Sequence, residues 1–320
     1  MADYSRVAPE LRSVLEVFPE IDFSQGIAPH RDPAAARPPL PTPPALEVVR
    51  QEQRTVPGVA GEPDAAVLLY TPPGAATGLR PAVLHIHGGG FVIGDAATFG
   101  ALCRATALTH DCVVISVDYR LAPETRWPGA LKDCYAALCW MHASAAELGI
   151  DPARIVVMGE SAGGGHAAAL ALHAREQGGP AICFLLMDAP MLDDRTGTTS
   201  DPHPHVGHFI WTPEMNRFGW TSLLGVEAGG PDVPAAAVPA RAQDLSGLPP
   251  TFISVGALDL FLEEDIEWVR RLTRAGVAAE LHVIPGAYHG FGFAASAPQV
   301  EQVSQLRTAA LNRVFSAQSG

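Results

Sequence analysis

The sequence predicts an α/β fold in which helices flank a mostly parallel sheet of about eight strands. Short, almost wholly apolar runs recur along the chain, and such runs are typical of strands buried on both faces. Helical patterns lie between most of these runs, so right-handed crossovers would join parallel strands. With 320 residues, of which 48% are hydrophobic and 17% charged, the chain can form one large domain with an attached subdomain.

The first 45 residues predict a helical arm followed by a linker. The residues spaced for one face of a helix are Val7, Leu11, Val14, Leu15 and Phe18. Residues 28–44 are dense in proline and predict an extended linker. We expect this segment, 1–45, to cross over to the main domain and to form part of a helical cap.

The core is expected in two parts, residues 46–190 and 246–320. Residues 46–56 and 65–72 alternate in part between apolar and polar side chains, which predicts an antiparallel pair at the start of the sheet. The buried strands are expected at residues 82–87, 112–119, 154–159, 182–190, 251–259 and 279–286. Helices are expected at residues 102–110, 130–148, 162–177 and 262–275.

Residues 191–245 interrupt this alternation. Segments of this length without a strand and helix pair are usually lids or insertions, so we predict the second half of a cap, packed against the N-terminal arm. The segment contains Asp201, His203, His205 and His208, which could imitate metal ligands. Because prolines at 202 and 204 interrupt these residues, a helix that would align them as ligands is not expected. A solvated loop is therefore the preferred interpretation, and no metal is expected.

A serine lies between two glycines where a strand changes into a helix. In the stretch from Gly159 to Gly163, Ser161 is the central residue of Gly-x-Ser-x-Gly. Such a turn strains the serine backbone and exposes its hydroxyl above the sheet, while glycines two residues away avoid a Cβ clash. The helix that follows directs its free N–H groups at the same place. We interpret Ser161 as a nucleophile.

A serine hydroxyl needs a base, and the base needs an orienting acid. The expected chain order on this kind of sheet is serine, acid, histidine, with the acid and the histidine each following a late strand. Asp259 ends the apolar run 251–259, and His289 follows the run 279–286. Both therefore lie at the carboxyl edge of the sheet, where sites in open α/β sheets gather.

Three consecutive glycines supply the third requirement, a site for a negatively charged oxygen. They follow the strand 82–87 and allow backbone N–H groups to turn into the cleft. We expect Gly89, Gly90 and the N–H of Ala162 to line this oxyanion hole. His87 is expected to hold the loop through a side-chain hydrogen bond.

Together these residues resemble the hormone-sensitive-lipase-like esterases, the bacterial family IV carboxylesterases of the α/β-hydrolase fold. The matching motifs are HGGGF at 87–91, DYRLAPE at 118–124, GESAGG at 159–164, Asp259, and YHGF at 288–291. The resemblance implies that Ser161, Asp259 and His289 form the triad. Two positions depart from the family pattern: Glu160 replaces the usual Asp or Thr, and Leu260-Phe261 replaces the usual Pro-Leu after the acid.

The resemblance implies hydrolysis of small to medium carboxylic esters through an acyl-enzyme, without a metal or organic cofactor. Acyl chains of about two to eight carbons are implied by the family alone. The substrate pocket is expected to include Phe91, Phe209 and Trp211, although packing within the cap explains such aromatic residues equally well. Alternatives are a lactone or amide hydrolase with the same triad, or a non-catalytic small-molecule receptor.

Charge and cysteine content bound the partners and the compartment. The net charge of −13 argues against nucleic-acid binding and against a polybasic membrane anchor. No signal peptide or membrane-spanning run is evident, and five cysteines without CxxC spacing indicate free thiols, so a cytoplasmic protein is expected. The last strand should lie at the sheet edge, where similar enzymes often form homodimers. Glu160, Glu263 and Glu264 are expected either to hydrogen-bond behind the site or to be exposed.

Overall fold

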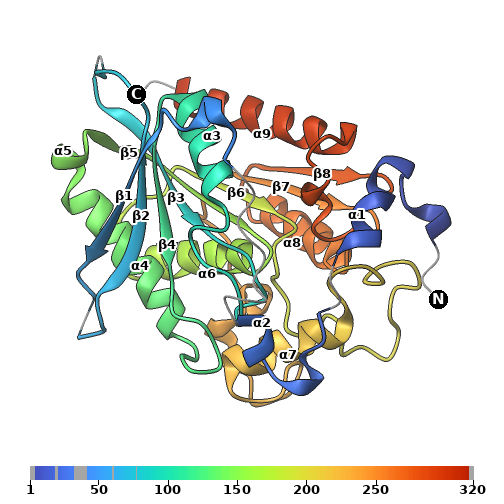
Figure 1. The fold of residues 1–320 in the computed structure, drawn as a ribbon. Helices are drawn as coiled ribbons and strands as arrows, with labels where there is room; N and C mark the ends of the chain where they lie inside the picture. The colour runs from blue at the N-terminus through green and yellow to red at the C-terminus, as the bar shows by residue number, and fades with distance from the viewer. Residues whose placement is uncertain (1–3, 19–20, 32–41, 60, 77, 317–320) are drawn as a thin grey trace.

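A computed structural model describes residues 4–18, 21–31, 42–59, 61–76 and 78–316. It contains the predicted eight-stranded sheet, in the order β1-β2-β4-β3-β5-β6-β7-β8 (Figure 1). Strand β2 pairs antiparallel with β1 and with β4, and every other pairing is parallel. The strands are β1 (Arg50–Val56), β2 (Ala65–Thr71), β3 (Arg80–Ile86), β4 (Val113–Asp118), β5 (Ile150–Glu160), β6 (Phe184–Asp188), β7 (Thr251–Gly256) and β8 (Ala279–Ile284).

Helices cover both faces of the sheet, as predicted (Figure 1). One face carries α3 (Gly100–His110) and α9 (Pro298–Ser316), and the other carries α4 (Gly129–Ala143), α6 (Ala162–Glu176) and α8 (Leu262–Arg274). The short α5 (Ala145–Leu148) follows α4 directly, so the helix expected at 130–148 is divided in two. The helix α9 follows the last strand, outside the strand and helix alternation on which the prediction was based.

The core is divided by the two-residue period of the strands. Leu84, Val157 and Ile253 belong to the cluster under α4, α6 and α8. Their neighbours one position earlier, among them Val83 and Val156, belong to the cluster under α3 and α9. Because both faces of these strands are buried, no polar alternation marks them in the sequence.

The N-terminal arm is less regular than predicted. Instead of one helix it forms two 3₁₀ turns, Tyr4–Arg6 and Pro9–Leu11, and then α1 (Arg12–Val17). A proline has no N–H to continue a helix, so Pro9 can only begin a new turn. The arm docks beside β8, where Ala8 N donates to Gly286 O at 3.0 Å and Tyr288 Oη donates to Leu11 O at 2.8 Å.

The predicted linker differs from the structure where it is described. Its first residues form the short helix α2 (Ala28–Arg31), so they are not extended. Residues 32–41 lie outside the described residues.

The 191–245 segment lies between β6 and β7 and contains α7 (Pro213–Leu224). Thr212 caps this helix by accepting a hydrogen bond from Met215 N, and Pro213 occupies its first position. The arm touches this segment, since the ring of Phe23 stacks on that of Phe218 at 4.7 Å, and α2 lies next to α7 in Figure 1. Among the helices of the described ranges, none is long and apolar enough to cross a bilayer.

Candidate active site

Ser161 stands at the turn between β5 and α6. Its φ of 54° and ψ of −122° lie in a region that is costly for any residue with a Cβ. Two glycines make this turn possible: a Cβ on Gly159 would collide with Gly163 O, and a Cβ on Gly163 would collide with Ile86 O. The strained backbone is fixed from both sides, because Ser161 N donates to Asp188 O at 2.8 Å and Met191 N donates to Ser161 O at 2.9 Å.

His289 bridges the serine and the aspartate. Its Nε2 lies 3.0 Å from Ser161 Oγ, and its Nδ1 lies 2.9 Å from Asp259 Oδ2. The loop after β8 carries the histidine, and Gly290 follows it at a φ of 75°. Three side chains from three different strand ends thus form one chain of hydrogen bonds.

The aspartate is oriented by its own loop. Asp259 is buried, and its Oδ1 accepts a hydrogen bond from Phe261 N at 3.0 Å, which leaves Oδ2 for the imidazole. The ring of Phe261 meets the imidazole of His289 edge-on, with centroids 5.1 Å apart. Phe261, where the family usually has leucine, therefore forms one wall of the histidine's site.

The glycine loop lies directly against this turn. A Cβ on Gly88 would lie 3.4 Å from Ser161 Cβ, so the two segments are in contact. Gly89 and Gly90 have φ values of 125° and 57°, which residues with a side chain avoid. The carbonyl of Gly89 accepts from Val92 N and Ile93 N at 3.0 Å, which closes the loop. Ala162 is the first residue of α6, so its N–H has no acceptor within the helix.

Known esterases are similar to this chain in sequence and in fold. Residues 83–293 match the model of the family described as the alpha/beta hydrolase fold. The chain is 36% identical to the carboxylesterase NlhH of Mycobacterium tuberculosis over 319 residues, covering 97% of each protein. It is 34% identical to the esterase LipI of the same species, covering 97% of this chain and 95% of LipI. The solved structure of a bacterial heroin esterase superimposes with a TM-score of 0.89 at 36% identity, covering 98% and 99% of the two chains.

This chain belongs to the hormone-sensitive-lipase-like α/β-hydrolases. It is a carboxylic ester hydrolase.

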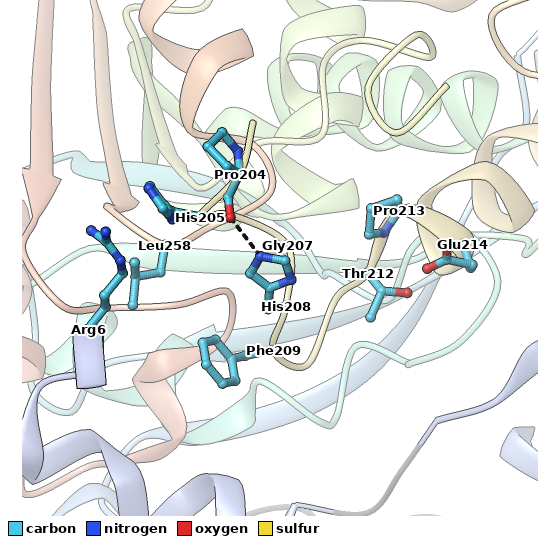
Figure 2. Close-up of a pocket in the computed structure, with 10 residues that line it drawn as sticks. All are labelled: Arg6, Pro204, His205, Gly207, His208, Phe209, Thr212, Pro213, Glu214 and Leu258. Carbon is cyan, nitrogen blue, oxygen red and sulfur yellow. Dashed lines mark hydrogen bonds between the residues drawn. The ribbon is translucent and has the colours of Figure 1, made fainter. Parts of the chain in front are cut away.

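The esterase does not bring all three predicted pocket residues to the serine. The ring of Trp211 lies against Gly90 and 6.2 Å from that of His289. Phe91 is buried against the 191–245 segment, with its ring 4.8 Å from that of Trp220. Phe209 is directed elsewhere: it lines a cavity of about 590 Å³ whose lining includes none of the triad residues (Figure 2).

The cavity in Figure 2 is also lined by two of the histidines considered as metal ligands. His205 and His208 line it, and His208 Nε2 bonds to Pro204 O at 3.2 Å, the dashed line in Figure 2. Within the described ranges, no three His, Cys, Asp or Glu side chains converge as the ligands of a metal ion would.

A stack of aromatic rings supports the glycine loop of the esterase. His87 Nδ1 bonds to Gly88 O at 2.8 Å, and its ring stacks on Tyr119 at 4.2 Å. Tyr119 Oη in turn donates to His87 O at 2.9 Å, and the Tyr119 ring meets His166 at 4.9 Å. Burial lowers the pKa of His87 to about 4 and that of His166 to about 3, so both imidazoles are neutral.

The three glutamates whose roles were left open by the sequence have different environments in the structure. Glu160 bonds to His85 Nε2 at 3.0 Å behind the serine, and Glu263 is exposed. Glu264 is buried and accepts from Leu192 N at 2.6 Å, which fastens the start of the 191–245 segment to α8.

Sequence reasoning did not identify Arg31 and Asp265. Arg31 extends from α2 to the residues after the glycine loop: it donates to Val92 O at 2.6 Å, to Ala122 O, and to Glu124 at 2.7 Å. Asp265 is fully buried, and neither carboxyl oxygen has a hydrogen-bond partner among the described residues. No local pattern marks Arg31, because its partners come from segments distant in the chain.

Proposed function

We propose that this esterase hydrolyses small to medium carboxylic esters with short acyl chains, through an acyl-enzyme on Ser161. The observation that carries the proposal is the bridging imidazole, with His289 Nε2 3.0 Å from Ser161 Oγ and Nδ1 2.9 Å from Asp259 Oδ2. This is the geometry that a serine nucleophile, a general base and an orienting acid require.

In the first half of the reaction, Ser161 Oγ attacks the ester carbonyl while His289 Nε2 accepts its proton. The carboxylate of Asp259 accepts the Nδ1–H bond, which keeps Nε2 free to accept and stabilises the imidazolium. The developing oxyanion is bound by the N–H groups of Gly89, Gly90 and Ala162. The imidazolium then donates its proton to the departing alcohol oxygen, which leaves an acyl group on Ser161 and a neutral imidazole.

Water completes the cycle. His289 Nε2 removes a proton from the water that attacks the acyl carbon, and the same N–H groups bind the second oxyanion. The imidazolium then returns its proton to Ser161 Oγ as the carboxylic acid leaves. Every proton is carried by His289, so the cycle uses no group outside this chain and its substrates.

The substrate range is tested by reagents of different chemistry. We expect a fluorophosphonate to label Ser161, and Ser161→Ala to abolish both labelling and hydrolysis of p-nitrophenyl esters. Removal of a nucleophile that acts with its base typically costs about 10⁶-fold in kcat. Absence of an adduct would favour a non-catalytic receptor. Hydrolysis of lactones or anilides well above linear esters would favour the alternative hydrolases.

We further propose that residues 1–45 and 191–245 together form a cap over the site, between core segments 46–190 and 246–320. The Phe23–Phe218 stack and the Arg31 contacts support this division.

We also propose a cytoplasmic homodimer. The location is supported by five free cysteines, and the dimer by the position of β8 at the sheet edge with Val283 40% exposed. A monomer by light scattering across micromolar concentrations would refute the dimer.

A further inference from the structure

The indole of Trp211 lies across the two parts of the catalytic arrangement. A Cβ built on Gly90 would collide with Trp211 Cη2 and would lie 2.7 Å from its Cζ2, so the six-membered ring packs on the oxyanion loop. The same indole lies 6.2 Å from the imidazole of His289, centroid to centroid. Ser161 contacts both neighbours of the indole, because its Oγ bonds to that imidazole and its Cβ adjoins the glycine loop at Gly88. A substrate group that extends from Ser161 past Gly90 would therefore meet the ring.

The indole is held in this position by hydrogen bonds and packing. Trp211 is only 4% exposed, and its Nε1 donates to Asn216 Oδ1 at 3.1 Å. Asn216 is itself completely buried, and its Nδ2 donates to Thr196 O at 2.7 Å. The ring of Phe23, from the N-terminal arm, packs edge-on at 6.3 Å. Moving the indole would leave buried polar atoms without partners, which is costly.

The backbone before the indole is strained. Ile210 has a φ of 60°, which is an outlier for a β-branched residue. Trp211 N donates to Phe209 O at 2.6 Å across the same turn. The turn sends neighbouring aromatic residues to different places: Phe209 lines the cavity of Figure 2, whereas Trp211 packs on Gly90. Such strain persists where the surrounding structure determines the conformation, and it is common at functional sites.

We propose that Trp211 is the specificity-determining residue that stops the acyl chain, and that Asn216 is the positioning residue that holds it there. This inference rests on the proposed acyl-enzyme at Ser161. An acyl group of a few carbons ends before the indole, whereas a longer group has to displace a ring that is buried and hydrogen-bonded. Rejection of long acyl groups thus comes from a fixed wall.

Two ester series test this inference in Trp211→Ala. One series varies the acyl group of p-nitrophenyl esters from acetate to decanoate, and the other varies the alcohol of acetate esters. We expect the ratio of kcat/KM for octanoate to that for acetate to rise by about tenfold or more, since even one methylene changes pocket selectivity by about that factor. The ratios within the alcohol series should stay as in the wild type. Asn216→Ala should move the acyl ratio in the same direction by a smaller factor.

Phe209→Ala is the matched control, because it removes an aromatic ring from the same turn that lines the cavity of Figure 2. We expect it to keep the wild-type acyl ratio. Trp211→Phe maintains apolar packing, should fold where the alanine variant fails, and should give an intermediate ratio. An unchanged acyl ratio in variants that a fluorophosphonate still labels, or a change confined to the alcohol series, would overturn the role of Trp211. A wild-type protein that the reagent does not label would instead overturn the proposed acyl-enzyme.

Discussion

Individual residues in this esterase show which parts of a site follow from sequence and which need the fold. Ser161 directly follows β5, and Asp259 and His289 lie in the loops after β7 and β8, so the carboxyl edge of the sheet could be predicted as their meeting place. Arg31 and Asn216 could not be predicted in this way, because their partners, Val92 O and Thr196 O among them, are backbone atoms brought close only by tertiary packing. Phe209 and Trp211 are two residues apart, but their side chains lie in different places because of the backbone conformation of Ile210.

Asp265 is a buried acid that we expect to reduce stability at neutral pH. Burial, then Glu264 and Asp259, raise the pKa of Asp265 well above its usual value. The folded state therefore binds this proton more tightly than the unfolded chain does, so its stability falls as pH rises above about 4. Asp265→Asn should raise the free energy of unfolding at pH 7.5 by about 1–3 kcal/mol, with almost no gain near pH 4.

Urea unfolding at the two pH values measures this difference. The exposed neighbour Glu263 provides the control, since Glu263→Gln neutralises an acid in the same helix at a solvated position. Equal free energies of unfolding for wild type and Asp265→Asn at pH 7.5 would show that the buried carboxyl does not destabilise the fold.

At the scale of elements, α7 and the glycine loop are built to touch. Gly219 lies in α7, and its neighbour across the contact is the carbonyl of Gly90.

The sequence predicted strands and core helices well because burial imposes their periodicity. It predicted the arm poorly, because Pro9 divides the arm and because contacts with the loop after β8 fix its course.

Gly219→Ala should disturb catalysis more than stability. The added Cβ would lie 2.6 Å from Gly90 O, a backbone atom, so the helix or the oxyanion loop has to shift. We expect kcat to fall by about 10²-fold, as on loss of one oxyanion donor. The better helix propensity of alanine, about 1 kcal/mol, should offset part of the strain in thermal unfolding. Gly78→Ala is the control, because its Cβ would meet nothing within 4 Å. If Gly219→Ala kept the wild-type kcat, the packing of α7 would not control the position of the glycine loop.

For the whole molecule, neutral buried histidines predict sensitivity to acid. Burial lowers the pKa of His87 to about 4 and of His166 to about 3, while the unfolded chain takes up these protons near pH 6.5. Below that pH the unfolded state binds more protons, so stability falls as pH drops from about 6.5 toward about 4. Each histidine contributes at most about 1.4 kcal/mol per pH unit to this slope.

His166→Phe tests this slope, since phenylalanine can keep the ring contacts with Phe91 and Tyr119. We expect the loss of stability between pH 6 and pH 4.5 to decrease by about one proton's worth, about 1.4 kcal/mol per pH unit. Substitution of the exposed His205 by glutamine should leave the slope unchanged. An identical slope in His166→Phe would show that this ring does not control acid stability.

The strand order of the sheet also has a consequence for biosynthesis. From β5 onward the strands lie side by side in the order in which they are made, and His289 lies in the loop after the last of them. Ser161 leaves the ribosome 128 residues before His289, so a nascent chain contains the serine hydroxyl long before it contains the imidazole that bonds to it. A message truncated ahead of codon 289 would yield a polypeptide that contains Ser161 but lacks this imidazole. If His289 is the base proposed above, the esterase is inactive until that residue has been synthesised.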